Sequence, residues 1–272
     1  MRASLILTFF LICGFTSSMA QRTKVISLGM GTTYYYGDLT DQFNNMLLRP
    51  AGTIAYTNYF TDHFSFRTAF SFGEIGASDS EALSQARRLR NLHFKSKIYE
   101  ASGILIYEFR KDKNFGNNYV SEPFITPYVF GGIAFLYFNP QARLNGEWVN
   151  LQPLGTEGQF IPGASPGPYS RFQAAAPIGA GLNYRISERM GFSVELGLRV
   201  TMTDYLDDVS TFYADPALLL EHSGATAVAL SNRAPEGIFE PGDIRGGSSV
   251  NDYYFFGMFT LNYYLSRYAT SR

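Results

Sequence analysis

The sequence predicts an all-β protein, an eight-stranded antiparallel transmembrane β-barrel with short periplasmic turns and long extracellular loops. Three observations predict it: an N-terminal export signal, eight long segments of alternating apolar and polar residues, and connections that alternate between short and long. The 272-residue chain also has 19 Tyr and 24 Phe, as outer-membrane barrels often do. A secreted β-sandwich is the alternative. The formal net charge of −1 provides no basic footprint, so no nucleic-acid partner is expected.

The first twenty residues have the parts of a Sec signal peptide. Arg2 is followed by an apolar stretch and by a small-residue cleavage site at Ser18–Ala20. The apolar stretch is shorter than the roughly 20 residues that a membrane-spanning helix needs. We therefore expect a signal peptide at 1–20 and the outer-membrane barrel domain at 21–272. The one cysteine, Cys13, lies in the signal peptide, so the mature chain should contain no disulfide.

The first four alternating segments each have one apolar face. In 24–36, Ile, Leu, Met and Tyr oppose Ser, Gly and Thr, and 50–60 places Ile, Tyr and Phe together. In 64–75, four Phe oppose Ser, Arg and Ala, and in 92–109, Tyr, Leu and Phe oppose Glu and Ser. These segments are long enough to cross a membrane, which takes about 9–11 residues per strand, whereas strands of soluble sheets have about 5–6.

The second four segments continue the pattern with one exception. Segment 125–138 is apolar on both faces, so its orientation is not predicted. In 172–186, Ile, Leu and Tyr oppose Gln, Gly, Asn and Arg. The first half of 191–210 alternates without interruption, with Glu and Arg on its polar face. In 251–266, Tyr, Phe and Leu oppose Asp, Thr and Asn.

The connections alternate in length along the chain. The short or moderate ones are 61–63, 111–123 and 187–190, and the long ones are 37–49, 76–91, 139–171 and 205–250. Short turns at one end and long loops at the other are typical of outer-membrane barrels, and an even number of strands places both termini in the periplasm. A short helix is expected at 80–90, and the Pro- and Gly-rich tracts 162–168 and 235–243 favour irregular structure.

Five charged residues lie on the polar faces of the strands and should point into the barrel: Arg67, Glu100, Arg185, Glu195 and Arg199. Glu195 and Arg199 are about 13 Å apart along one strand, so each should pair with another strand. In a hairpin, Arg199 is expected opposite Gly179 or Gly181, where the missing side chains leave room. Eight strands enclose little more than their own side chains, and an unpaired buried charge is costly. These residues are therefore predicted to form a structural lumen network; a channel is the alternative.

An acidic cluster follows the seventh segment: Asp204, Asp207 and Asp208. Short acidic side chains bond to nearby backbone, so we interpret the cluster as a loop anchor at the strand exit. Three arginines of the second long loop are its expected partners: Arg87, Arg88 and Arg90. Calcium binding is the alternative, although the spacing differs from that of an EF-hand loop.

No catalytic, cofactor or metal site is predicted. The sequence GASPG at 163–167 matches a nucleophile elbow, but it lies among prolines and lacks the required strand and helix. His63, His93 and His222 have no neighbours at zinc-ligand spacing. The protein is expected not to be an enzyme. One alternative is an enzyme that modifies outer-membrane lipid, for which His93 and the acidic cluster would supply the site. The other is a structural barrel of unrelated role.

Five stretches resemble the PorG-type family of Bacteroidetes outer-membrane barrels, a component of the type IX secretion system. They are YYYGDL (34–39), RNLHFKSKIYE (90–100), TPYVFGGIAFLYFNP (126–140), GLNYRISERMGFSVELGLR (181–199) and TDYLDDVSTFY (203–213). The resemblance extends over about 25–265 and implies no catalytic residues. It implies an assembly or anchoring subunit that contacts PorK/PorN-type ring proteins on its periplasmic side, in a membrane of outer-membrane lipid and lipopolysaccharide.

The periplasmic contact is predicted at the start of the third turn. Arg110, Lys111 and Lys113 lie in or beside 111–123, which is the longest connection on that side. The C-terminal tail, SRYATSR, is the second choice.

Overall fold

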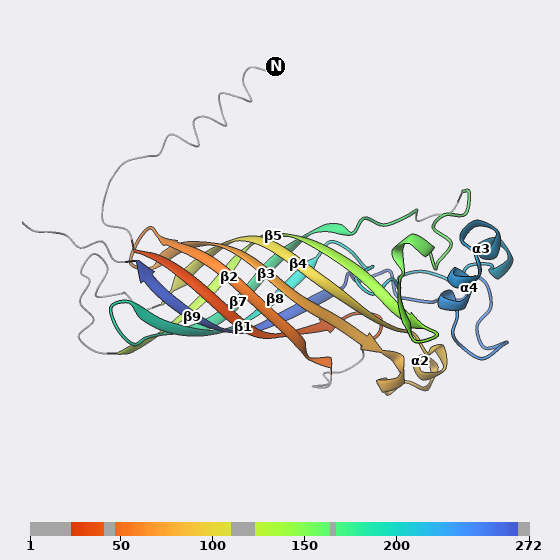
Figure 1. The fold of residues 1–272 in the computed structure, drawn as a ribbon, viewed down its shortest axis with the longest axis horizontal. Helices are drawn as coiled ribbons and strands as arrows, with labels where there is room; N and C mark the ends of the chain where they lie inside the picture. Colours follow the sequence, from red (N-terminus) through yellow and green to blue (C-terminus); the bar gives the residue numbers. More distant parts are fainter. Residues whose placement is uncertain (1–22, 41–46, 110–122, 164–166, 266–272) are drawn as a thin grey trace, which may run out of the picture.

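A computed structural model describes residues 23–40, 47–109, 123–163 and 167–265. In this part of the chain, eight long antiparallel strands form a closed barrel, and the predicted fold class is confirmed (Figure 1). The barrel strands are β1 (Lys24–Tyr36), β2 (Arg49–Tyr59), β3 (Phe64–Ser78), β4 (His93–Glu108), β5 (Phe124–Leu144), β7 (Phe172–Arg185), β8 (Met190–Thr201) and β9 (Tyr253–Leu265). The remaining strand, β6 (Glu147–Asn150), pairs with β5.

The ring closes where the first strand meets the last. β1 pairs with β2 on one side and with β9 on the other, from Lys24 opposite Leu265 to Tyr36 opposite Tyr253. β4 pairs with β5, which continues the ring to β7. Each of the eight strands therefore has a partner on both sides, which is what a β-structure needs in lipid.

The outer wall carries large apolar side chains that are exposed in the described part of the chain. Examples on the barrel strands are Leu28, Met30, Ile54, Phe70, Ile133, Phe135, Leu196 and Phe259. Apolar patches of this extent are rare on soluble monomers. Together with the closed sheet, this outer surface is typical of a barrel whose outside faces lipid.

Aromatic residues mark both borders of the apolar wall. Near one border, strand pairing aligns four of them into a loop-end aromatic row: Phe72, Tyr99, Tyr137 and Phe172. Near the other, Phe64 lies opposite Tyr107, and Tyr184 lies opposite Phe192. The interval from Tyr99 to Tyr107 on tilted β4 corresponds to about 20 Å of membrane thickness, close to the usual apolar band.

The two ends of the barrel differ. At the turn end, short connections join β2 to β3 and β7 to β8. At the loop end lie the long connections and, as Figure 1 shows, the helices α2 (Gln85–Arg90), α3 (Pro216–Ser223) and α4 (Ala225–Ser231). None of the helices in the described residues is long and apolar enough to cross a membrane.

The structure departs from the expected element boundaries in the loops. β5 has 21 residues, because it continues past residue 138 to Leu144 and turns back into β6. Helix α2 begins at Gln85, not at 80, after a 3-10 turn at Asp79–Glu81. α3 and α4 were not predicted. Asp215 caps α3 through the N–H groups of its first turn and Pro216 occupies its first position, which is an ordinary helix start signal.

Candidate functional site

A first ion pair crosses the barrel lumen from wall to wall. Arg67 of β3 donates from Nη1 to Oε2 of Glu195 on β8 at 2.7 Å. Three strands separate β3 from β8 in either direction around the ring, so this pair joins opposite walls. The Tyr128 hydroxyl donates to the same carboxylate at 2.8 Å, and the Arg67 guanidinium lies 5.2 Å from the Phe130 ring centroid.

A second ion pair lies nearer the loop end. Arg199 of β8 lies 3.2 Å from Glu100 of β4, measured from Nη2 to Oε1. Tyr254 donates to Glu100 at 2.7 Å, and the Arg199 guanidinium lies 4.6 Å from the Phe256 ring centroid. Both members of the pair are buried, and Glu100 is fully so. Together, the two ion pairs extend across the lumen of the barrel.

The predicted position of Arg199 in the hairpin was wrong. Arg199 lies opposite Pro177, whereas Gly179 pairs with Gly197 and Gly181 pairs with Glu195. The room for the guanidinium comes from its own strand, because a Cβ at Gly197 would collide with Nη1 of Arg199. The expectation failed because it assumed a different hairpin register.

The fifth predicted lumen residue, Arg185, lies at the turn end of β7. Its guanidinium donates to the Ser187 and Glu188 carbonyls and lies 4.2 Å from the Tyr264 ring centroid. Arg185 thus contacts the turn between β7 and β8.

The space left beside the ion pairs is small. Two cavities of about 30 and 20 Å³ border them, and Arg67 lines both. Such volumes hold about one or two water molecules each. Among the described residues, these two cavities beside the ion pairs are too small for a solute larger than water.

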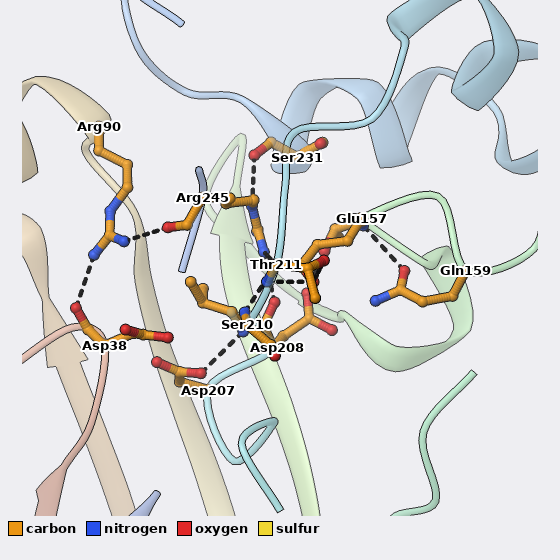
Figure 2. A network of polar contacts seen from close by, with 12 residues as sticks. Asp38, Arg90, Glu157, Gln159, Asp207, Asp208, Ser210, Thr211, Ser231 and Arg245 are labelled. Atoms are coloured by element: carbon orange, nitrogen blue, oxygen red, sulfur yellow. Dashed lines mark hydrogen bonds and ion pairs between the residues drawn. The ribbon is translucent and has the colours of Figure 1, made fainter. Parts of the chain in front are cut away.

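At the loop end, a polar network around Arg245 joins several loops (Figure 2). Its Nη1 donates to Glu157 Oε1 at 2.9 Å and to the Asp208 carbonyl at 2.6 Å, and its Nε donates to the Ser231 carbonyl at 3.0 Å. Both side chains of the Arg245–Glu157 pair are almost fully buried. One guanidinium therefore joins three loop segments that are distant in sequence.

Glu157 receives further hydrogen bonds from the loop that follows β8. The backbone N–H of Ser210 donates to it at 2.9 Å, and the Thr211 hydroxyl donates at 2.7 Å. This carboxylate thus accepts bonds from a charged group, a hydroxyl and the backbone, which is the satisfaction that a buried charge requires.

Arg90, at the end of α2, connects two more segments. It donates from Nε and Nη2 to the two oxygens of Asp79, each at 2.8 Å. Its remaining N–H groups reach the Arg245 carbonyl at 2.6 Å and the Asp38 carbonyl at 3.0 Å. We call the joined segments the cap: residues 37–40, 79–92, 155–161, 203–213, 231–247 and Asp252.

Asp207 and Asp252 meet at one phenol. Tyr35 Oη lies 2.6 Å from Asp207 Oδ2 and 2.9 Å from Asp252 Oδ1. A phenol has a single proton to donate, so the second contact requires a proton on one of the carboxyls. Burial and the mutual charge of the two groups agree with this, since they raise the pKa of Asp207 well above its ordinary value. Burial also raises the pKa of Asp252.

The other two predicted anchor residues also lie in the cap. Asp208 adopts a left-handed backbone conformation with φ of 70° and accepts bonds from the Thr156 and Tyr169 hydroxyls. Asp204 has a buried oxygen, Oδ2, for which the described residues supply no hydrogen-bond donor.

The expected arginine partners do not bond to the three aspartates in the described part of the chain. Arg90 pairs with Asp79, and Arg88 donates to the Ala82 carbonyl. Asp207 and Asp208 instead receive bonds from hydroxyl and backbone donors. Among the described residues, no group of three or more His, Cys, Asp or Glu is arranged to hold a metal ion.

The histidine of the alternative enzyme site lies elsewhere. His93 accepts a hydrogen bond from the Arg143 N–H at 2.9 Å, and its ring lies in a T-shaped arrangement with Trp148, 6.2 Å between centroids. The carboxyls of Asp207 and Asp208 are buried inside the cap. The structure therefore does not bring His93 and the acidic cluster together, and Ser165 lies outside the described residues.

The pKa shifts predict that the cap loosens as pH rises. Burial raises the pKa of Asp204 to about 7 and that of Asp208 to about 6. The pKa of an Asp in an unfolded chain is near 3.9. Between about pH 4 and pH 7, the folded cap therefore binds more protons than the unfolded chain. The stability that these two carboxyls contribute is then fully present below about pH 4 and is lost as pH rises towards 7. Amide hydrogen exchange of 203–213, corrected for intrinsic rates, should show more protection at about pH 5 than at about pH 8.

Asp204→Asn is the matched control for this pH dependence. It keeps the size of the side chain and removes one titrating group, so the difference in protection between the two pH values should shrink. Equal protection of the wild-type cap at both pH values would contradict the prediction.

Sequence reasoning missed the two residues that hold most of the cap. Arg245 and Glu157 lie in loops without periodicity, and their pairing spans 88 positions. Asp79 and Arg90 carried a local signal, since they flank the short helix, but Arg90 was assigned to a different acid.

Comparisons with known proteins give a family and a general likeness. The family described as Domain of unknown function (DUF6089) matches residues 3–152. No curated protein matches the chain. The structure is similar to the attachment invasion locus protein Ail of Yersinia pestis, solved with the heparin analogue sucrose octasulfate, at 11% identity and a TM-score of 0.42 over 90% of this chain and 99% of that one.

Two further solved barrels show likeness of the same order. Neisserial surface protein A matches at 7% identity and a TM-score of 0.42, over 89% of this chain and 96% of that one. OprG from Pseudomonas aeruginosa matches at 9% identity and a TM-score of 0.40, over 91% and 97%. Since the family match extends over more than half of the 272 residues, the protein belongs to the family described as Domain of unknown function (DUF6089).

Proposed function

We propose that this protein is an anchoring or assembly subunit of the type IX secretion system, inserted in the outer membrane with its loop end outside and its turn end in the periplasm. The resemblance to PorG-type barrels supports the proposal. The observation that carries it is where the resembling stretches lie: 90–100 contains Arg90 and Glu100, and 203–213 contains the three aspartates. The residues that resemble the family are thus those that build the lumen pair and the cap.

A closed barrel favours anchoring over transport. Ion pairs occupy the lumen, and the cap joins the loops over one end. A protein of this design offers surfaces to partners and no path to solutes. In planar bilayers it should give no steady conductance, whereas stable open steps of porin size would contradict this part of the proposal.

The proposed contact with PorK/PorN-type ring proteins is on the periplasmic side. Arg110, Lys111 and Lys113 are its proposed members, and all three lie outside the described residues, as does the C-terminal tail. The described residues on either side, Phe109 and Phe124, place the two ends of this connection at the turn end of the barrel.

Deleting residues 112–121 should abolish co-purification of PorK/PorN-type proteins from outer membranes, because it removes most of the longest turn-end connection. The control is a deletion of residues 236–241 at the loop end, which should leave co-purification unchanged. Membrane insertion of both variants is checked by heat-dependent migration on gels. Undiminished recovery of the ring proteins with the first deletion would remove this contact, and failure of the intact protein to recover them would remove the secretion role.

A further inference from the structure

Basic residues extend along the outer wall of β4, β5 and β7, just beyond the loop-end aromatic row. Outward positions alternate along a strand, so Lys97 and Lys95 follow Tyr99 on the outer face of β4. Arg143 occupies an outward position of β5, opposite Trp148 of β6. Arg171 immediately precedes Phe172. We call these four residues the basic strip: Lys95, Lys97, Arg143 and Arg171.

Three of the four residues contact rings, an amide or the backbone of the wall: Lys95, Arg143 and Arg171. Lys95 Nζ lies 3.9 Å from the Trp148 ring centroid, and the Arg171 guanidinium lies 5.5 Å from that of Tyr137. Arg171 also donates to the Asn139 side-chain carbonyl at 3.2 Å. Arg143 donates to the Gly146 carbonyl. Within the described part of the chain, none of the four forms an ion pair, so their charges remain available to a ligand.

The strip has an excess of positive charge. Glu74 of β3 lies opposite Lys97 and is the acidic residue beside it in the same register. The side-chain amides of Asn139 and Gln141, which lie beside the strip, both donate to Asn150 Oδ1, at 2.9 and 2.7 Å. Both neutral amides are therefore already hydrogen-bonded within the protein. Four cations beside one carboxylate attract an anion that carries more than one negative charge.

The strip is confined to one side of the barrel. At the loop-end parts of β1, β8 and β9, the outward side chains include Tyr36, Val200 and Tyr253, which are aromatic or aliphatic. Positive charge is therefore not a general property of this border. A localised strip indicates a site for a particular ligand.

The ligand must have an anionic part and an apolar part. Below the aromatic row, the same strands expose Ile133, Phe135 and Leu105 to the hydrocarbon region. Arginine and lysine above an aromatic row lie at the depth of lipid headgroups, where they attract phosphate. We propose that the basic strip binds the phosphate groups of a phosphorylated glycolipid of the surrounding leaflet, whose acyl chains lie along the apolar wall of β4 and β5. This site depends on the position of the barrel in the membrane and is independent of the secretion role.

The test uses the full-length mature protein in detergent micelles, with native mass spectrometry to count bound lipid. The probes are bis-phosphorylated lipid A and the same lipid A after removal of its phosphates. Wild-type protein should bind the phosphorylated form at least about tenfold more tightly. The variant Lys95→Gln/Lys97→Gln/Arg171→Gln should lose most of that preference, since each surface cation contributes roughly fivefold. The matched control Lys24→Gln, at the turn end, should retain it.

Additional measurements distinguish lipid phosphate from free inorganic phosphate. Single variants keep the test valid if the triple variant does not fold. Excess inorganic phosphate should not displace the lipid; displacement would show a site for free phosphate and overturn the lipid proposal. Equal binding of both lipid A forms would show attraction by acyl chains alone, and an unchanged preference in the triple variant would place the site elsewhere. If the triple variant fails to migrate as a folded barrel, the singles Lys95→Gln and Lys97→Gln should each show a partial loss, and Lys97→Arg should retain binding.

Discussion

Replacing Arg245 with Met should detach the cap while the barrel stays folded. The change leaves the Glu157 carboxylate buried without its cation and frees two carbonyls, those of Asp208 and Ser231. Breaking one partner of a buried pair typically costs about 3–5 kcal/mol. Because the groups that Arg245 joins lie in loops outside the barrel strands, that loss should appear as local opening of the cap. Hydrogen exchange of 155–161 and 205–213 should rise by orders of magnitude.

The double variant Glu157→Gln/Arg245→Met is the control for this prediction. It removes both charges together, so no unpaired charge remains and part of the protection should return. Exchange in the barrel strands should not change in either variant. Full protection of the cap in Arg245→Met would show that Arg245 does not hold the loops.

Replacing Glu100 with Ala should destabilise the barrel itself. Glu100 is fully buried, pairs with Arg199 and accepts the Tyr254 hydroxyl bond, so its loss leaves a guanidinium unpaired in the lumen. We expect a loss of about 3–5 kcal/mol in the free energy of unfolding. Urea unfolding of the protein in lipid vesicles, followed by heat-dependent gel migration, measures this loss.

Two variants separate the cost of an unpaired charge from the cost of lost volume. Glu100→Leu/Arg199→Met replaces the whole pair with apolar side chains and should be more stable than Glu100→Ala, as seen when buried pairs are replaced together. Glu147→Gln, at an exposed position of β6, should change stability by less than about 0.5 kcal/mol. A Glu100→Ala barrel as stable as the wild type would show that the lumen pair is not a stabilising element.

The barrel could be predicted because its cause is local. Lipid outside and side chains inside impose a period of two on every strand, and that period is visible in segments such as 191–202 without knowledge of any contact. The inward direction of Arg67, Glu100, Glu195 and Arg199 follows from the same alternation. Which acid meets which arginine does not, because pairing across the lumen depends on the stagger of strands around a closed ring.

The cap could not be predicted because its contacts are distant in sequence. Tyr35 meets Asp207 across 172 positions, and Arg90 reaches the Arg245 carbonyl across 155. No periodicity or motif connects such residues. The composition of the acidic cluster indicates an anchor, and arginines of the second long loop were its predicted partners. In the structure, the partners of Asp207 and Asp208 are hydroxyls and backbone N–H groups. The composition of the sequence does not identify such partners.

The seam between β1 and β9 places Lys24 directly opposite Leu265, so the first and last positions of the barrel are adjacent in space. A short linker could therefore join them, and new ends could be opened in a turn such as 61–63 without removing any strand pairing. A circularly permuted chain of this kind should refold into the same barrel. It would show that the order in which the strands leave the ribosome is not what defines the ring.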